Sequence, residues 1–172
     1  MENNHILIIG EKGAGKTTLI SKLALEMPKP LTGFITVSSN RDLEGYHSIY
    51  IFNINDRKRI MTDNCKVGIC NGRSRTVFTN VFETIGVKYI MEKGSSVIMD
   101  EIGFMEEKAT LFHEAILLRL NSSLPVIAAV REGTETPFLS KIKNYPNIRV
   151  ISLSPENREQ VFLELLPIVR NW

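Results

Sequence analysis

The sequence has few cysteines and lacks long apolar runs. Only two of its 172 residues are cysteines, Cys65 and Cys70, and four residues separate them. With no second pair of Cys or His nearby, this spacing is a poor match to a zinc site. The spacing also permits a disulfide, but we favour two reduced thiols, the usual state in the cytoplasm. A membrane-spanning helix needs about 20 mainly apolar residues, so we expect no membrane partner.

The sequence also lacks a strong excess of charge of either sign. Its formal net charge is +2, which gives no argument for a nucleic-acid surface, and we expect no nucleic-acid partner. Residues 1–5 (MENNH) have no basic stretch leading into an apolar one, so we predict no secretory signal and a cytoplasmic location. A hydrophobic share of 43% is ordinary for a globular protein, and the length predicts one domain spanning 1–172.

A short apolar run near the start leads into a glycine-rich turn and an amphipathic helix. His5–Ile9 (HILII) is typical of a strand buried on both faces, and it ends at Gly10. Lys16–Met27 then carries apolar residues at helical spacing, and Pro28 and Pro30 end that helix. The pattern predicts a strand, a tight loop and a helix in direct succession.

Strand and helix patterns alternate along most of the remaining chain. Strands are predicted at Gly33–Val37, His47–Ile54, Ser96–Met99, Pro125–Val130 and Ile148–Leu153, and helices at Val81–Lys93, Glu107–Asn121, Phe138–Lys143 and Val161–Val169. We expect His47–Ile54 to form half of a hairpin at the sheet edge, 56–79 to be an irregular, lid-like excursion, and Ser154 to cap the last helix with Pro155 at its first position. The alternation predicts an α/β three-layer sandwich with a mostly parallel sheet.

The loop after the first strand matches a phosphate-binding motif in full. Residues 10–17, GEKGAGKT, fit the pattern GxxxxGK[ST] between a buried strand and a helix. Backbone N–H groups of such a loop surround phosphates, and the helix N-terminus adds positive potential. We predict that Lys16 reaches the β and γ phosphates and that Thr17 binds Mg²⁺. The predicted nucleotide-binding residues are Gly10, Glu11, Lys12, Gly13, Ala14, Gly15, Lys16, Thr17 and Thr18.

Two adjacent carboxylates follow a second buried strand. In Ser96–Glu101 (SVIMDE) the apolar run delivers Asp100 and Glu101 at its carboxyl end, where ligands of open α/β sheets bind. We predict that Asp100 serves the Mg²⁺ and that Glu101 acts as general base on the attacking water. A Glu directly after the metal Asp suits an enzyme that activates water better than a kinase, which activates a substrate hydroxyl.

The acidic pair belongs to a longer string, DEIGFME, at residues 100–106. Together with GFIT at 33–36, PVIAAV at 125–130 and SPENR at 154–158, it resembles the small nucleoside-triphosphatase family first described from thermophiles and also called cancer-related NTPases. This resemblance implies a RecA-like fold and slow, Mg²⁺-dependent hydrolysis of several nucleoside triphosphates. It implies that 10–17 binds phosphate, that Asp100 serves the metal and that Glu101 is catalytic.

The arginines are less clearly placed. The family usually has two arginines after the GF-x-T strand; Arg41 is a candidate for the first, and the second is missing. Arg131, after the PVIAAV strand, and Arg158, in the SPENR segment, are candidates for transition-state or nucleotide contacts. A basic stretch from Arg57 to Arg75 is either a solvated surface or able to close over the triphosphate.

Three functions remain compatible with these residues. The first is hydrolysis of nucleoside triphosphates such as ATP and GTP by a monomer, with weak base selectivity because no base-reading motif is present. The second is a P-loop kinase acting on a small nucleoside, nucleotide or other metabolite. The third is a nucleotide-dependent switch, which needs the same site as the hydrolase.

Overall fold

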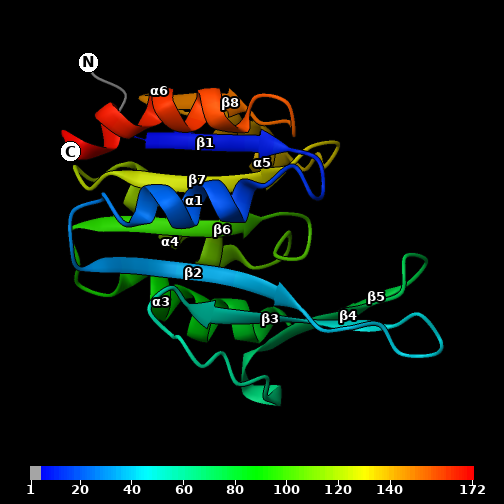
Figure 1. Cartoon of the computed structure of the whole chain (residues 1–172). Helices are drawn as coiled ribbons and strands as arrows, with labels where there is room; N and C mark the ends of the chain where they lie inside the picture. Colours follow the sequence, from blue (N-terminus) through cyan, green and yellow to red (C-terminus); the bar gives the residue numbers. More distant parts are fainter. Residues whose placement is uncertain (1–4) are drawn as a thin grey trace.

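Parallel strands form one side of the sheet in the computed structural model, which describes residues 5–172. Across these residues one eight-stranded sheet has the order β5-β4-β3-β2-β6-β7-β1-β8 (Figure 1). The parallel strands are β1 (His5–Gly10), β2 (Leu31–Ser38), β6 (Ser96–Ile102), β7 (Val126–Arg131) and β8 (Ile148–Ser152). Each matches a predicted strand to within two or three residues.

An antiparallel meander extends the sheet beyond β2. It consists of β3 (His47–Asn53), β4 (Lys66–Cys70) and β5 (Arg75–Val77). The predicted hairpin is confirmed, since β3 pairs antiparallel with β2, but β3 is not the edge. The prediction of an irregular segment at 56–79 is wrong for β4 and β5. The sequence signal was weak because β4 is short and contains Gly68, and because β5 is mostly exposed.

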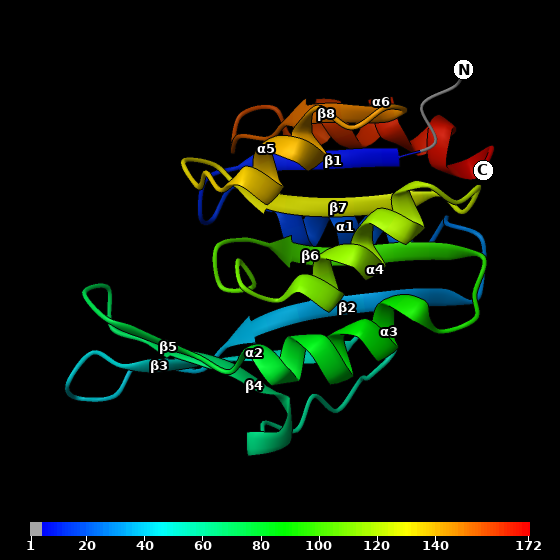
Figure 2. The same cartoon turned by 180° about the vertical axis from the view of Figure 1, so that it is seen from behind.

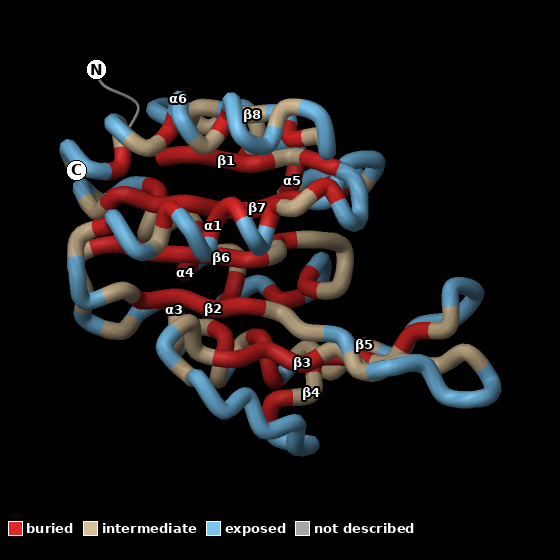
Figure 3. Tube along the Cα trace, in the orientation of Figure 1, coloured by how far each residue is buried: buried red, intermediate tan, exposed pale blue. Residues whose placement is uncertain are grey.

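Helices cover both faces of the sheet, which confirms the three-layer architecture. On one face lie α1 (Lys16–Ala24) and α6 (Arg158–Arg170). On the other lies a continuous helical segment made of α2 (Thr79–Val81), a π-helical turn (Phe82–Gly86) and α3 (Val87–Met91), followed along the chain by α4 (Thr110–Leu120) and α5 (Pro137–Lys143) (Figure 2). A short 3₁₀ turn, Asp63–Cys65, precedes β4. Figure 3 shows that β1, β6 and β7 are buried along most of their length, whereas the loops at the tip of the meander are exposed.

Two helix starts differ from the predictions. The helix predicted from Glu107 begins at Thr110. The last helix begins at Arg158 with Asn157 at the N-cap position, so the predicted cap at Ser154 is wrong. The Asn157 side chain accepts a hydrogen bond from Ser154 N–H at 2.9 Å and donates one to the Ser152 carbonyl at 3.0 Å. Residues 154–157 are thereby held as a turn, and the helix starts only after it.

The GFIT segment begins with Gly33, a position that requires glycine. Its φ is +107°, and a Cβ at this position would lie 1.9 Å from the carbonyl oxygen of Ile98 on β6. We expect Gly33→Ala to lower the free energy of unfolding by about 3 kcal/mol or more, because conformational strain adds to a clash with backbone. Chemical denaturation measures this loss. Gly45→Ala, at a similar φ of +83° with no atom within 4 Å, is the matched control and should lose much less.

Candidate active site

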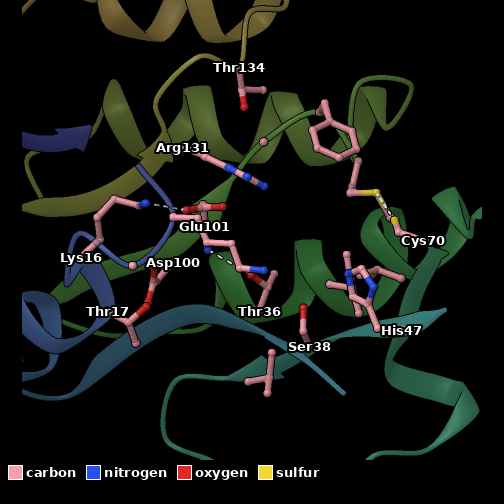
Figure 4. A pocket seen from close by; sticks show the side chains of 18 of the residues that line it. Lys16, Thr17, Thr36, Ser38, His47, Cys70, Asp100, Glu101, Arg131 and Thr134 are labelled. Atoms are coloured by element: carbon pink, nitrogen blue, oxygen red, sulfur yellow. Dashed lines mark hydrogen bonds and ion pairs between the residues drawn. The ribbon is translucent and has the colours of Figure 1, made fainter. Parts of the chain in front are cut away.

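A pocket of about 840 Å³ lies at the carboxyl ends of the parallel strands. The phosphate-binding loop, residues 10–17, follows β1, and Asp100 and Glu101 stand at the end of β6. Both segments line the pocket, as does Arg131 at the end of β7 (Figure 4). Topology alone produces this meeting, since parallel strands place their carboxyl ends at one edge of the sheet.

The phosphate-binding loop has the backbone conformation that the motif requires. Gly13 and Gly15 have φ values of 85° and 95°, which other residues rarely adopt. The Lys16 ammonium folds back over the loop and donates hydrogen bonds to the carbonyls of Gly10 at 2.8 Å and Glu11 at 3.0 Å. It also forms an ion pair with the Glu101 carboxylate at 3.0 Å. The Lys16 side chain is only 6% exposed, and its ammonium thus has partners both in the phosphate-binding loop and at Glu101.

Asp100 is a buried carboxyl group with an open coordination position. Its side chain is 3% exposed, and Oδ2 has no hydrogen-bond partner among the described residues. Burial and, to a lesser extent, the neighbouring Glu101 raise the pKa of Asp100 to about 6, against the opposing effects of the Thr17 hydroxyl and Lys16. Carboxylate and hydroxyl oxygens are the ligands that Mg²⁺ prefers, so Thr17 and Asp100 fit this cation.

Glu101 is half-exposed and faces the pocket. Its backbone N–H donates a hydrogen bond to the Thr36 hydroxyl at 3.3 Å, which anchors the end of β6 against β2. Its carboxylate points to Lys16 (Figure 4). The arrangement leaves the carboxylate of Glu101 accessible to a small molecule in the pocket, whereas that of Asp100 beside it is buried.

A third carboxyl group, Glu106, was missed by the sequence predictions. It is 2% exposed, lines the pocket and accepts a hydrogen bond from Gly103 N–H. Burial raises the pKa of Glu106 to about 7. The bond to Gly103 closes the loop that follows Glu101 and so fixes the direction in which the chain leaves β6. Its place in the DEIGFME string was the available signal, but no spacing argument gave it a role.

Arg158 contacts the phosphate-binding loop from its outer side. Its Nε donates to the Ala14 carbonyl at 2.6 Å and its Nη2 to the Gly13 carbonyl at 2.7 Å. A Cβ at Gly15 would lie 2.8 Å from the same guanidinium, so this glycine also gives Arg158 room. Arg131 is exposed and extends into the pocket beside Glu101 (Figure 4). Direct contacts of either arginine with a nucleotide stay predictions.

Replacing Arg158 with alanine should weaken nucleotide binding. The variant loses two charge-assisted hydrogen bonds, each worth about 1.5–3 kcal/mol, to the carbonyls that shape the loop. We therefore expect KM to rise by about tenfold or more, with a smaller change in kcat. Arg170→Ala, on the same helix, removes only the exposed pair with Glu26 and is the control. A loss of about 10³ in kcat alone would instead make Arg158 a transition-state arginine.

Other residues singled out from the sequence take structural places. Both cysteines are free and buried. Within residues 5–172 no group of three His, Cys, Asp or Glu side chains could hold a metal ion. His5 contacts the Leu120 carbonyl at 2.9 Å, and His113 stacks on Phe138. Of the basic stretch, Arg75 stacks over the Phe104 ring at 4.7 Å.

The fold and this pocket define a class of protein. Strand β7 lies between β1, which carries the phosphate-binding loop, and β6, which carries the acidic pair. A loop matching GxxxxGK[ST], a buried Asp beside the Thr hydroxyl and a neighbouring Glu together define a P-loop nucleotide-binding protein.

Comparisons with known proteins identify the family within this class. A family model described as NTPase matches residues 5–166, and the chain belongs to this family. The nucleoside-triphosphatase THEP1 of Methanothermobacter thermautotrophicus is 31% identical over 97% of both chains, and that of Thermotoga maritima is 29% identical over 96% of this chain and 95% of its own.

Solved structures agree on the fold. The crystal structure of THEP1 from Aquifex aeolicus has a TM-score of 0.75 at 24% identity and covers 96% of this chain and 98% of its own. The solution structure of a human cancer-related nucleoside triphosphatase has a TM-score of 0.67 at 20% identity, with 97% of both chains covered. As for membranes, no helix in residues 5–172 is both long and apolar enough to cross a bilayer.

Proposed function

We propose that the protein hydrolyses nucleoside triphosphates, including ATP and GTP, to the diphosphate and phosphate. The reaction is Mg²⁺-dependent, slow and weakly selective for the base. The observation that carries this proposal is the 3.0 Å contact between Lys16 of the phosphate-binding loop and Glu101. It puts a half-exposed carboxylate within reach of the position that the γ-phosphate takes when Lys16 binds it.

In the proposed reaction, some residues of the pocket bind the phosphates and another accepts a proton. N–H groups of the phosphate-binding loop and the Lys16 ammonium bind the phosphate oxygens. Glu101 accepts a proton from the water that attacks phosphorus. Thr17 and Asp100 would hold Mg²⁺, which would supply positive charge to neutralise the phosphates.

The ion pair between Lys16 and Glu101 gives substrate binding a second effect. A triphosphate offers Lys16 several anionic oxygens in place of one carboxylate, so the ammonium turns toward the phosphates. Glu101 then loses its ion-pair partner, and its carboxylate becomes free to accept a hydrogen bond from the attacking water. Arrival of the substrate thereby prepares the base.

We propose three further properties of the protein: its compartment, its assembly state and a lid over the pocket. The free, buried thiols of Cys65 and Cys70 support a reducing compartment such as the cytoplasm. The common sheet and its two helical layers support a single domain over 1–172 that acts as a monomer. We also propose that the meander and the basic residues near it cover the pocket as a lid.

Base selectivity is expected to be weak. The phosphate-binding loop, Asp100 and Glu101 contact only the phosphates and the cation, which all nucleoside triphosphates share. Phosphate release from ATP, GTP, CTP and UTP should agree within about tenfold in kcat/KM, or roughly 1.4 kcal/mol. Chelation of divalent cations should stop release from all four, and Mg²⁺ should restore it. A hundredfold preference for one base, or full release in chelator, contradicts this part of the proposal.

A further inference from the structure

The pocket extends well beyond the phosphate-binding loop. Its far part, which we call the far chamber, is lined by Val37, Ser38, Ile49, Val67, Phe82 and Met105. These residues come from β2, β3, β4, the π-helical turn and the loop after β6. None of the six is charged, and five are apolar, unlike the phosphate-binding end with its lysines. The pocket thus has two chemically different ends.

The acidic pair separates these ends. In Figure 4, Lys16 and Thr17 lie on one side of Asp100 and Glu101, and Ser38, His47 and Cys70 lie on the other. Glu101 is therefore the residue that faces both the phosphates and the far chamber. A molecule in this chamber meets the same carboxylate as the attacking water.

The wall of the far chamber is closely packed. Met105 lies against β4, where a Cβ at Gly68 would be 2.1 Å from its terminal methyl group. Its sulfur is 3.9 Å from the Cys70 thiol. Val67 is fully buried, and Phe82 is 2% exposed. The chamber is therefore formed by ordered side chains from several elements, as in pockets that bind small molecules.

The polarity of the phosphate-binding loop decides which part of a nucleotide faces this chamber. Lysine of this motif binds the β and γ phosphates, so the γ-phosphate ends next to Glu101. The base and ribose of the triphosphate lie at the opposite end of the phosphate chain. The far chamber therefore begins beyond the γ-phosphate of a bound triphosphate. Neither the phosphate chain nor a water molecule has an apolar group that would contact its walls.

The chemistry of the walls indicates the occupant. The partly exposed apolar side chains of Val37, Ile49 and Met105 suit a flat, uncharged group such as a nucleobase. The Ser38 hydroxyl can bond to sugar hydroxyls, and the neighbouring His47 has a buried Nδ1 without a partner among the described residues. A phosphate on the occupant would need cations, and none of the six residues that define the far chamber is a cation.

We propose that the far chamber binds a nucleoside, which accepts the γ-phosphoryl group in place of water. This inference rests on the proposed function, because it uses the same donor site and the same base. The nucleoside 5′-hydroxyl oxygen forms a bond to the γ-phosphorus, and its proton passes to Glu101. The bond from the γ-phosphorus to the bridging oxygen breaks, and that oxygen leaves with the electron pair on the nucleoside diphosphate. The products are a nucleoside monophosphate and a nucleoside diphosphate.

The test uses the full chain with Mg²⁺ and ATP labelled in the γ position. Adenosine, guanosine, cytidine and uridine are added separately, and labelled phosphate and labelled nucleoside monophosphate are separated and counted. At least one nucleoside should yield labelled monophosphate and lower the release of labelled phosphate in proportion. The four monophosphates, tested in parallel as acceptors, should give no labelled diphosphate.

Variants locate the acceptor in the far chamber. Val37→Trp fills it, and Val150→Trp, the same change on the exposed edge strand β8, is the matched control. Val37→Trp should lower transfer to the nucleoside at least about tenfold more than it lowers phosphate release, or about 1.4 kcal/mol of selective loss. Thermal unfolding shows whether each variant is folded. Ser38→Phe, at an exposed position near the strand end, serves if Val37→Trp does not fold.

Each result has a defined meaning. Phosphate release without any labelled monophosphate overturns the acceptor proposal and leaves the hydrolase intact. Absence of both products overturns the proposed function itself. Transfer only to monophosphates, or equal loss of both reactions in Val37→Trp, also overturns the proposal, because the occupant is then anionic or belongs to the donor.

Discussion

Lys16→Ala is expected to lose nearly all turnover and to bind triphosphates more weakly. Lys16 is the cation that the β and γ phosphates share, and removing one such donor to developing charge costs about 10²–10³ in kcat. The lost charge-assisted hydrogen bonds add about 1.5–3 kcal/mol to the binding deficit, which is about 10–150-fold in affinity. Phosphate release at saturating nucleotide and a direct titration measure the two effects separately.

Two controls sharpen this prediction. Lys22→Ala removes an exposed lysine of the same helix and should leave both quantities within about twofold, since exposed charges contribute little. Lys16→Arg keeps the charge but not the compact ammonium that fits between the Gly10 and Glu11 carbonyls. Hydrolysis by Lys16→Ala within a few fold of the original protein would refute the assignment of the phosphate-binding loop.

Glu101→Gln is expected to bind nucleotide and fail to hydrolyse it. Glutamine has nearly the same shape and can hold the attacking water, but it cannot take its proton. General-base assistance is worth about 10²–10⁴ in rate, or about 3–5 kcal/mol. Affinity should hold or rise, because the variant removes a negative charge beside a polyanion and frees Lys16 from its 3.0 Å ion pair. Phosphate release and nucleotide titration on one preparation test both halves.

The outcomes for Glu101 separate its possible roles. Glu107→Gln, an exposed carboxylate in the same loop, is the control and should change neither quantity. If Glu101→Gln loses binding as well as hydrolysis, Glu101 supports the structure of the site or binds the metal directly. If hydrolysis survives within a few fold, another group is the base. The acceptor reaction proposed above predicts that transfer to a nucleoside falls together with hydrolysis.

Most of the parallel half of the fold could be predicted from the sequence because β1, β6 and β7 are buried along most of their length. Runs such as HILII and PVIAAV are typical of strands buried on both faces of a parallel sheet, and the loops between them fix the order of strand and helix. The meander could not be predicted in the same way. β4 reads KVGIC, which contains only three apolar residues, and its pairing depends on contacts with β3 and with the loop after β6.

The same contrast holds for the site. Gly10–Thr17 and the adjacent pair Asp100 and Glu101 could be located because each motif is local in the chain and the sheet brings them together. The role of Glu106 depends on how its side chain folds back to Gly103, which the local sequence pattern does not show. The loop contacts of Arg158 depend on a segment 144 residues away, as for Arg158 and Ala14. The far chamber was missed because part of its wall comes from β4, whose pairing with β3 was not predicted.

The position of β1 between β7 and β8 has a consequence for how the protein is made. His5 pairs with Val126 on one side and with Ile148 on the other. β1 can therefore complete its pairing only after β7 and β8, which follow it far along the chain, have been synthesised. Contacts between residues so distant in the chain form late and slowly. On the ribosome, the strand that carries the phosphate-binding loop therefore lacks both of its neighbouring strands until β7 and β8 have emerged. A nucleoside triphosphate that binds only the native state would then stabilise the folded protein and not the nascent chain.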